Sequence, residues 1–405
     1  MGCRRVPFYD VVVIGGGIIG LSTAFQLAQR KKKVLILEQS DVGSGTSGAC
    51  DHMILLQSKL PGLPLKMALL SLEMYKAWQR DLGEDLWFET RGGMILVDKE
   101  EHLPFMERFV AEQESIGLNV TMLDKKQIRK KQPFVSERVL ASTYCPDDSQ
   151  IDPFCVLKAL LNAGARFGME LKKFSKVVAL ERSSDHWRVR VQNENKYEAQ
   201  VVVCAAGVWS REVCKMVGLE LPIRPKRGQI LVTEPIEPIG ETNVWDSDYI
   251  IAKHVSHMQK DETARRLGLG FAMSKTHPGN YLVGSTREYV GFDKSTTLEA
   301  FIAIAKRLVE LFPIFKNVRI IRTFAGLRPA CEDGKYVIGE DPENPGFFVA
   351  TGHEGDGIAL APITGALMTQ LICGEKTSLA IDELSPARFR SSKKQEQSTV
   401  ERGRF

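Results

Sequence analysis

Three glycines, Gly15, Gly17 and Gly20, fit the pattern G-x-G-x-x-G and directly follow the apolar run 11–14. In a dinucleotide site, the first glycine permits a tight turn and the second lets the backbone approach a pyrophosphate. The third allows close packing of the helix on the strand. Glu38 ends the next apolar run, where a carboxylate can accept hydrogen bonds from ribose hydroxyls. The spacing therefore predicts dinucleotide binding.

A second chemical feature is the stretch GHEGDGIALAP at 352–362, which carries His353, Glu354 and Asp356 among glycines. The pattern indicates a turn into a helix. Asp356 suits the N-cap of that helix, an ordinary structural role. Glu354 has no ordinary role as clear as this, although exposed carboxylates are common in turns. The functional hypothesis is that one of the two carboxylates faces a cationic part of a substrate, such as a secondary amine or a guanidinium.

The elements that must position these residues alternate between strand and helix. The runs 11–14 and 34–37 predict buried parallel strands on either side of a helix. The stretch GSGTSGAC at 43–50 could open a second helix onto a phosphate or a flavin ring. The apolar strand that begins at 199 leads to Ala206 and Gly207, which would bring the backbone close to the nucleotide. Residues 346–372 then repeat the order of strand, glycine-rich turn and helix. A nucleotide fold that closes at the carboxyl end is unusual for NAD enzymes and favours FAD.

The composition is that of an ordinary globular chain. With 405 residues, it is long enough for two domains or for one domain with an inserted cap. A net charge of +4 is too small to indicate a surface that binds nucleic acid. Eight cysteines without CxxC pairs favour reduced thiols, no metal site and a cytoplasmic setting, with peripheral membrane association left open. No apolar run reaches the length that a transmembrane helix needs.

Seven motifs in a fixed order carry a family resemblance: GGGIIG, GSGTSGA, AAGVWS, RPKRGQI, YLVGSTREYVGFD, GLRPACEDGKYVIG and GHEGDGIALAP. From Asp10 to about Leu384 the chain resembles the FAD-dependent D-amino acid oxidase (DAO) superfamily, in its glycine oxidase and sarcosine oxidase branch. GACDHMILLQSKLPG together with GHEGDGIALAP is most similar to catalytic β subunits of multi-subunit amine dehydrogenases. These are the D-hydroxyproline dehydrogenase, opine oxidase and hydrogen cyanide synthase types.

The resemblance implies an α/β fold, in which a Rossmann-like FAD-binding domain is interleaved with an α+β substrate domain built on a mixed sheet. WRVRVQ (187–192) fits an alternating strand of the first domain, and DYIIAKH (248–254) fits a strand of the second. Cys331 and His52 lie in suggestive stretches for a covalent flavin link, although packing explains both. The expected division is 1–80, 151–217 and 325–385 for FAD binding, 81–150 and 218–324 for substrate, and 386–405 as a disordered tail.

The site residues also follow from the resemblance. Arg328 matches the arginine that holds the substrate carboxylate in glycine oxidase, and the last helix points its N-terminus at the flavin pyrimidine edge. Glycine oxidase has a further arginine where this chain has Gly355, so one anion contact is missing. His353, Glu354 and Tyr249 complete the catalytic candidates, although a hydrogen-bonded turn histidine and a core aromatic residue are equally ordinary. The expected cofactor-binding residues are Gly15, Gly17, Ile18, Ile19, Gly20, Glu38, Gln39, Gly45, Thr46, Ser47, Val177, Ala206, Gly207, Trp209, Arg328, Gly355, Asp356, Gly357 and Ile358.

The activity implied is oxidation of a small amino or imino acid, similar to D-proline, hydroxyproline or an opine, to its imine by hydride transfer to FAD. The electrons would pass to a partner redox subunit, carrying flavin or iron–sulfur centres, or to quinone. Two alternatives remain open. One is a free-standing glycine or sarcosine oxidase that releases hydrogen peroxide, and the other is a non-catalytic FAD-binding assembly subunit.

Overall fold

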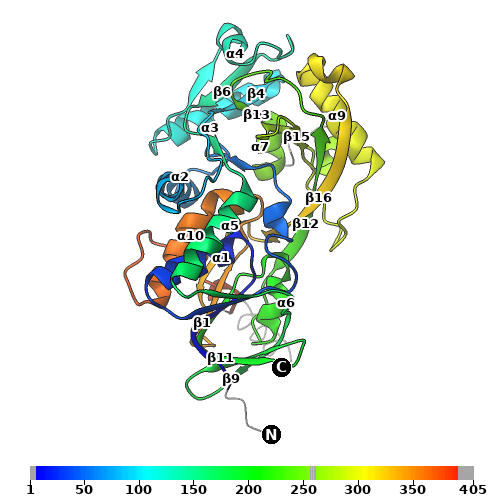
Figure 1. Ribbon diagram of the computed structural model, residues 1–405. Coiled ribbons are helices and arrows are strands. Elements are labelled where there is room, and N and C mark those ends of the chain that lie inside the picture. The colour runs from blue at the N-terminus through cyan, green and yellow to red at the C-terminus, as the bar shows by residue number, and fades with distance from the viewer. Residues whose placement is uncertain (1–5, 256, 258, 260, 391–405) are drawn as a thin grey trace, which may run out of the picture.

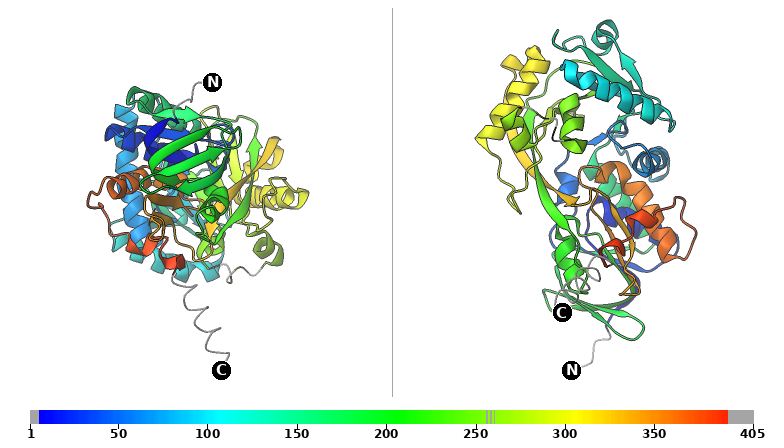
Figure 2. Two further views of the ribbon diagram at one scale, coloured as in Figure 1. Left: turned by 90° about the horizontal axis from the view of Figure 1, so that it is seen from below. Right: turned by 180° about the vertical axis from the view of Figure 1, so that it is seen from behind.

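The computed structural model describes residues 6–255, 257, 259 and 261–390. Two eight-stranded sheets dominate the molecule, and the views in Figures 1 and 2 show them at opposite ends of an elongated body. The lower sheet in Figure 1 contains β1 and β11, and the upper sheet contains β4 and β6. A short third pairing joins β3 (Met53–Ile54) to β7 (Ser149–Gln150).

The first sheet is parallel at its centre. Its order is β17-β18-β11-β1-β2-β8, and β10 pairs with both β11 and β9. The pairs formed by β1, β2, β8, β11 and β18 are parallel, whereas β9, β10 and β17 add antiparallel partners. The strands are β1 (Phe8–Ile14), β2 (Val34–Leu37), β8 (Glu170–Lys172), β9 (Val177–Arg182), β10 (Trp187–Val191), β11 (Lys196–Cys204), β17 (Val337–Glu340) and β18 (Phe347–Thr351).

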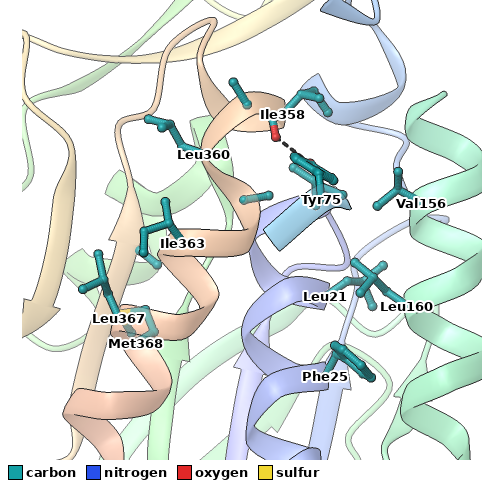
Figure 3. Close-up of a cluster of buried hydrophobic side chains, with 14 of the residues drawn as sticks. Leu21, Phe25, Tyr75, Val156, Leu160, Ile358, Leu360, Ile363, Leu367 and Met368 are labelled. Carbon is teal, nitrogen blue, oxygen red and sulfur yellow. Dashed lines mark hydrogen bonds between the residues drawn. The ribbon is translucent and has the colours of Figure 1, made fainter. Parts of the chain in front are cut away.

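Four helices build an apolar core on one face of this sheet: α1 (Ile18–Gln29), α2 (Leu63–Asp81), α5 (Pro153–Arg166) and α10 (Gly357–Ile372). In Figure 3, Leu21 of α1 lies close to Leu160 of α5, and α10 lies on the other side of α1. The Tyr75 hydroxyl of α2 donates a 2.6 Å hydrogen bond to the Ile358 carbonyl (Figure 3). Because Ile358 lies in the first turn of α10, this bond fixes the start of the helix. Side chains of β9, β10 and α6 (Ser210–Lys215) cover the opposite face.

The second sheet is mixed, with the order β16-β12-β15-β14-β13-β4-β6-β5. Its two longest strands, β12 and β16, pair along 223–233 and extend towards the first sheet (Figure 1). The strands are β4 (Gly93–Val97), β5 (Thr121–Leu123), β6 (Ala141–Cys145), β12 (Ile223–Thr233), β13 (Asn243–Asp246), β14 (Ala272–Lys275), β15 (Tyr281–Gly284) and β16 (Ile320–Cys331). The accompanying helices are α3 (Leu103–Glu114), α4 (Lys125–Lys131), α7 (Ser247–His254), α8 (Glu262–Leu267) and α9 (Leu298–Leu311).

The α/β class with a mixed second sheet is confirmed. The alternation expected for WRVRVQ is present, because Trp187, Val189 and Val191 are buried while the two arginines between them are exposed. The expected boundary at residue 325 falls inside β16, which is one continuous strand.

The strand expected for DYIIAKH is wrong, because these residues lie in α7. The carboxylate of Asp246 accepts a 2.9 Å hydrogen bond from the Tyr249 amide and caps the helix. Ile250 and Ile251 are both completely buried. Capping and burial therefore override the strand preference of β-branched residues.

The expected disordered tail begins too early. Residues 386–390 belong to the folded chain: Arg388 pairs with Asp333 at 2.7 Å and Arg390 with Asp341 at 2.6 Å. Phe389 packs against the core on the second face of the first sheet. These contacts hold the segment to the body of the protein. The rest of that expectation, 391–405, lies outside the described residues.

Candidate functional site

A cavity opens at the carboxyl ends of the parallel strands of the first sheet, the usual ligand position in such folds. It encloses about 1510 Å³ of empty space, part of which is open to solvent. One wall is formed by the residues that follow β1, β2, β11 and β18. The other wall comes from β12, β16 and α7 and includes Gly228, Ile230, Tyr249, Gly326 and Arg328. The cavity therefore lies where the two sheets meet.

The glycines after β1 form a cradle that side chains would fill. Gly15 has φ +116°, and a Cβ there would collide with the carbonyl oxygen of Ala205. A Cβ on Gly17 would lie 3.2 Å from the Ser47 hydroxyl. Gly20 lies behind this surface, where a Cβ would strike the Gly15 carbonyl, so its role is helix–strand packing. The first amides of α1 thus face open space suited to a pyrophosphate.

Polar groups around this cradle are held in place by hydrogen bonds. Glu38 accepts from the Gly16 amide at 2.7 Å and from the Ser40 amide at 2.8 Å, which fixes its carboxylate at the cavity wall. The Ser47 hydroxyl accepts from the Ile18 amide at 3.0 Å. Glu38 retains free lone pairs for ribose hydroxyls, so the cradle and its acid both fit a dinucleotide such as FAD.

The N-terminus of α10 faces the same cavity, with Gly355, Gly357 and Ile358 in its wall. The amides of a first helical turn lack partners within the helix and carry partial positive charge. Asp356 occupies the N-cap position, but its side chain makes no capping hydrogen bond, so the expected cap is wrong.

Asp356 instead forms a buried ion cluster. Its carboxylate lies 2.9 Å from the Lys59 ammonium and 2.8 Å from that of Lys253, and it accepts a 3.1 Å hydrogen bond from Tyr336. Burial raises the pKa of Asp356, but the two ammonium groups outweigh it and hold the pKa well below its usual range. Asp356 therefore joins the turn to the loop after β3 and to α7, and it does not line the cavity.

Glu354 faces the cavity and has left-handed backbone geometry, with φ +47°. Its carboxylate lies 3.3 Å from the Lys226 ammonium, and its side chain is 19% exposed. Burial acts to raise the pKa of Glu354, but Lys226 and Arg328 outweigh it and lower the pKa to about 2. The group is thus a carboxylate at neutral pH, with one lysine partner.

Arg328 is held on β16 with its guanidinium in the cavity wall. It donates to the Thr286 carbonyl at 2.8 Å and to the Ser285 hydroxyl at 3.0 Å. Gly228 leaves room for it, because a Cβ there would collide with the guanidinium. Among the described residues Arg328 has no ion-pair partner, so its positive charge is free to bind an anion.

His353 and Tyr249 also line the cavity, but both are strongly packed. The His353 ring stacks on the Tyr336 ring, with 5.2 Å between the ring centroids. The Nε2 atom of His353 lies 3.0 Å from the Thr364 hydroxyl. Burial lowers the pKa of His353 to about 4, so its ring is neutral at pH 7. Burial raises the pKa of Tyr249 to about 12, so its phenol stays protonated.

Every residue expected at the site lines the cavity except Gly20 and Asp356. Cys331 and His52 are absent from the lining, which fits the packing roles considered for them. Sequence reasoning missed the lysine partners of the two turn carboxylates. It also missed Arg287, whose only local signal is its place just after a buried strand in the YLVGSTREYVGFD motif.

A Rossmann-type phosphate cradle with a second mixed sheet over it defines a two-domain protein of the dinucleotide-binding class. Residues 10–371 match the DAO family, described as FAD dependent oxidoreductase, and the chain belongs to this family. It is therefore an FAD-dependent enzyme of the amino acid oxidase and dehydrogenase class.

The relatives match over nearly their full lengths. Glycine oxidase from Geobacillus kaustophilus (strain HTA426) is 29% identical over 391 residues, which cover 94% of this chain and 97% of the relative. Hydrogen cyanide synthase subunit HcnC from Pseudomonas aeruginosa is 27% identical over 423 residues, with coverages of 94% and 96%. The crystal structure of the Geobacillus kaustophilus glycine oxidase matches with a TM-score of 0.84 at 27% identity, covering 94% of this chain and 98% of that one.

No helix in 6–255 or 261–390 combines the length and the apolar character needed to cross a bilayer.

Proposed function

We propose that the protein oxidises a small amino or imino acid, of the D-proline, hydroxyproline or opine type, to its imine. The observation that carries the proposal is the free guanidinium of Arg328 in a cavity shared with the FAD cradle. A planar guanidinium binds a carboxylate through two parallel hydrogen bonds. Arg328 keeps N–H donors beyond those used by the Thr286 carbonyl and the Ser285 hydroxyl.

FAD, when bound, accepts a hydride from the α-carbon of the amine. The chain itself contributes binding, orientation and electrostatics. Arg328 holds the substrate carboxylate, and the amides at the start of α10 stabilise negative charge near the cofactor. Glu354 carries a charge at neutral pH and is assigned to the cationic amine of the substrate. His353 and Tyr249 add neutral, closely packed side chains to the cavity wall.

The electron acceptor in this proposal is a partner redox subunit or quinone. It is supported by the likeness to HcnC, which is itself named as a subunit. The second candidate is a free-standing oxidase that releases hydrogen peroxide, favoured by the 29% identity to a glycine oxidase. Peroxide released at the rate of substrate oxidation by the purified chain in air would decide for the oxidase.

The test is anaerobic bleaching of the purified flavoprotein by a panel of D-proline, hydroxyproline isomers, glycine, sarcosine and opines. We expect at least one of these compounds to reduce the flavin within seconds. Arg328→Met should slow the same reduction by roughly a hundredfold, since losing a charge-assisted carboxylate contact costs about 3 kcal/mol. Failure of every compound to bleach a fully loaded flavoprotein would revive the assembly-subunit alternative.

A further inference from the structure

Arg287 is a buried cation whose guanidinium is only partly satisfied by the described residues. It is 8% exposed, and its Nε and Nη1 atoms are buried without any hydrogen-bond partner. Within the described parts of the chain, the Arg287 guanidinium also makes no ion pair. Its one contact of note is with the Tyr249 ring, whose centroid lies 4.3 Å away. Because buried donors of a cation are costly when they lack hydrogen bonds, Nε and Nη1 call for a ligand.

The position of Arg287 connects it to the cavity. It follows Ser285 and Thr286, the residues that accept the hydrogen bonds of the Arg328 guanidinium. Tyr249, beneath the Arg287 guanidinium, is itself part of the cavity wall. A glycine makes space for this side chain, since a Cβ on Gly270 would lie 3.1 Å from Nη1. Arg328 therefore donates to the segment that carries Arg287, and the Arg287 guanidinium lies behind Tyr249, just outside the cavity lining.

The nearby lysines all have an ion-pair partner among the described residues. Lys226 pairs with Glu354, and both Lys59 and Lys253 pair with Asp356. One further carboxylate, Asp51, lines the cavity, and burial raises its pKa against the opposing field of Arg328. Asp51 makes no ion pair with a described residue. The site thus carries excess positive charge, concentrated in two unpaired guanidinium groups.

We propose that Arg287 binds a second carboxylate of the substrate, so that the preferred substrate is an amino or imino dicarboxylate. This inference rests on the proposed function and narrows its substrate class. A monocarboxylate held by Arg328 would leave the Arg287 guanidinium buried and unpaired, whereas a dicarboxylate neutralises both arginines. The amine between the two carboxylates is cationic. In this proposal it is bound by Glu354, the ionised carboxylate of the cavity wall.

The first experiment compares two substrates that differ by one carboxylate, N-methylglycine and N-(carboxymethyl)glycine, in anaerobic reduction of the holoenzyme flavin. We expect the dicarboxylate to reduce the flavin with an apparent Kd at least tenfold lower. Arg287→Met should remove this preference, and Arg287→Lys should keep part of it. Arg322→Met is the control, because Arg322 is an exposed arginine of β16, and it should leave the preference unchanged.

A second readout needs no turnover. Glutarate and butyrate, which are not amines, are titrated into the wild-type holoenzyme, and binding is followed by the shift of the flavin absorbance bands. We expect glutarate to bind at least tenfold more tightly than butyrate. If it does so while no amine bleaches the flavin, the proposed oxidation fails but the dicarboxylate site stands.

Equal binding of glutarate and butyrate to the wild type would overturn the proposal, even if Arg287→Met cannot be purified. So would equal losses for both amine substrates in Arg287→Met, because they would assign Arg287 to the shared carboxylate or to structure.

Discussion

Replacement of Asp356 by asparagine should destabilise the protein strongly, because the Asp356 carboxylate is the ion-pair partner of two buried ammonium groups. The Lys59 and Lys253 side chains are 2% and 10% exposed, and both lie within 3 Å of the carboxylate, at 2.9 and 2.8 Å. Removing one partner of a buried ion pair costs about 3–5 kcal/mol, since the remaining charge stays in a poorly solvated place. Asparagine keeps the shape and one acceptor, so we expect a loss of about 3 kcal/mol.

The assay is urea unfolding of the holoenzyme, followed by tryptophan and flavin fluorescence. With a slope of roughly 3 kcal/mol per M urea, the midpoint should fall by about 1 M. Asp81→Asn is the matched control, because Asp81 is exposed at the end of α2, and its midpoint should move by less than about 0.2 M. Adding Lys253→Met to Asp356→Asn should recover part of the loss. An unchanged midpoint for Asp356→Asn would refute the view that this cluster locks the turn.

Three further predictions test the cofactor cradle, the cavity acid and the buried histidine. Gly15→Ala should purify with less than about a tenth of the wild-type FAD content, measured by absorbance, because its φ is +116° and its Cβ would strike Ala205. Glu354→Gln should raise KM far more for cationic substrates than for neutral ones, measured by flavin reduction; an equal rise for both would remove Glu354 from amine binding. Burial lowers the pKa of His353 to about 4, below the unfolded value near 6.5, so the unfolded state binds the proton first as pH falls. Its contribution to stability should therefore decrease from pH 6.5 down to pH 4, and His353→Gln should flatten the urea midpoint over that range.

Local spacing was sufficient to predict which residues surround the cavity after β1, and their contact with the nucleotide stays a prediction. The turn at Gly15 and Gly17 depends on backbone conformation and close approach, and both leave a signature in consecutive residues. The position of Glu38 at the end of a strand could also be predicted, because a run of apolar residues ends at a definite position in the sequence. The same reasoning failed for 248–254, where burial on both sides makes a short apolar run compatible with either a helix or a strand.

The charge pairing of the site could not be predicted in this way. Asp356 forms ion pairs with Lys59 and Lys253, which come from two distant parts of the chain. Glu354 follows a strand of the first sheet and pairs with Lys226 of the second sheet. No local pattern carries the information that a lysine is buried, or that it faces a particular carboxylate. Arg287 was missed for the same reason: its significance lies in what it does not contact, which is visible only once the surrounding chain is placed.

The two carboxylates of the 352–362 turn are two residues apart and yet serve different purposes. The left-handed φ of +47° at Glu354 turns the backbone between them, so that Glu354 lines the cavity while Asp356 points away from it into the lysine cluster. A single acidic turn can therefore combine a structural lock with a charge that faces the cavity. The two neutralising substitutions should therefore affect different measurements. Asp356→Asn should lower the urea midpoint of unfolding, whereas Glu354→Gln should change substrate binding with little effect on that midpoint.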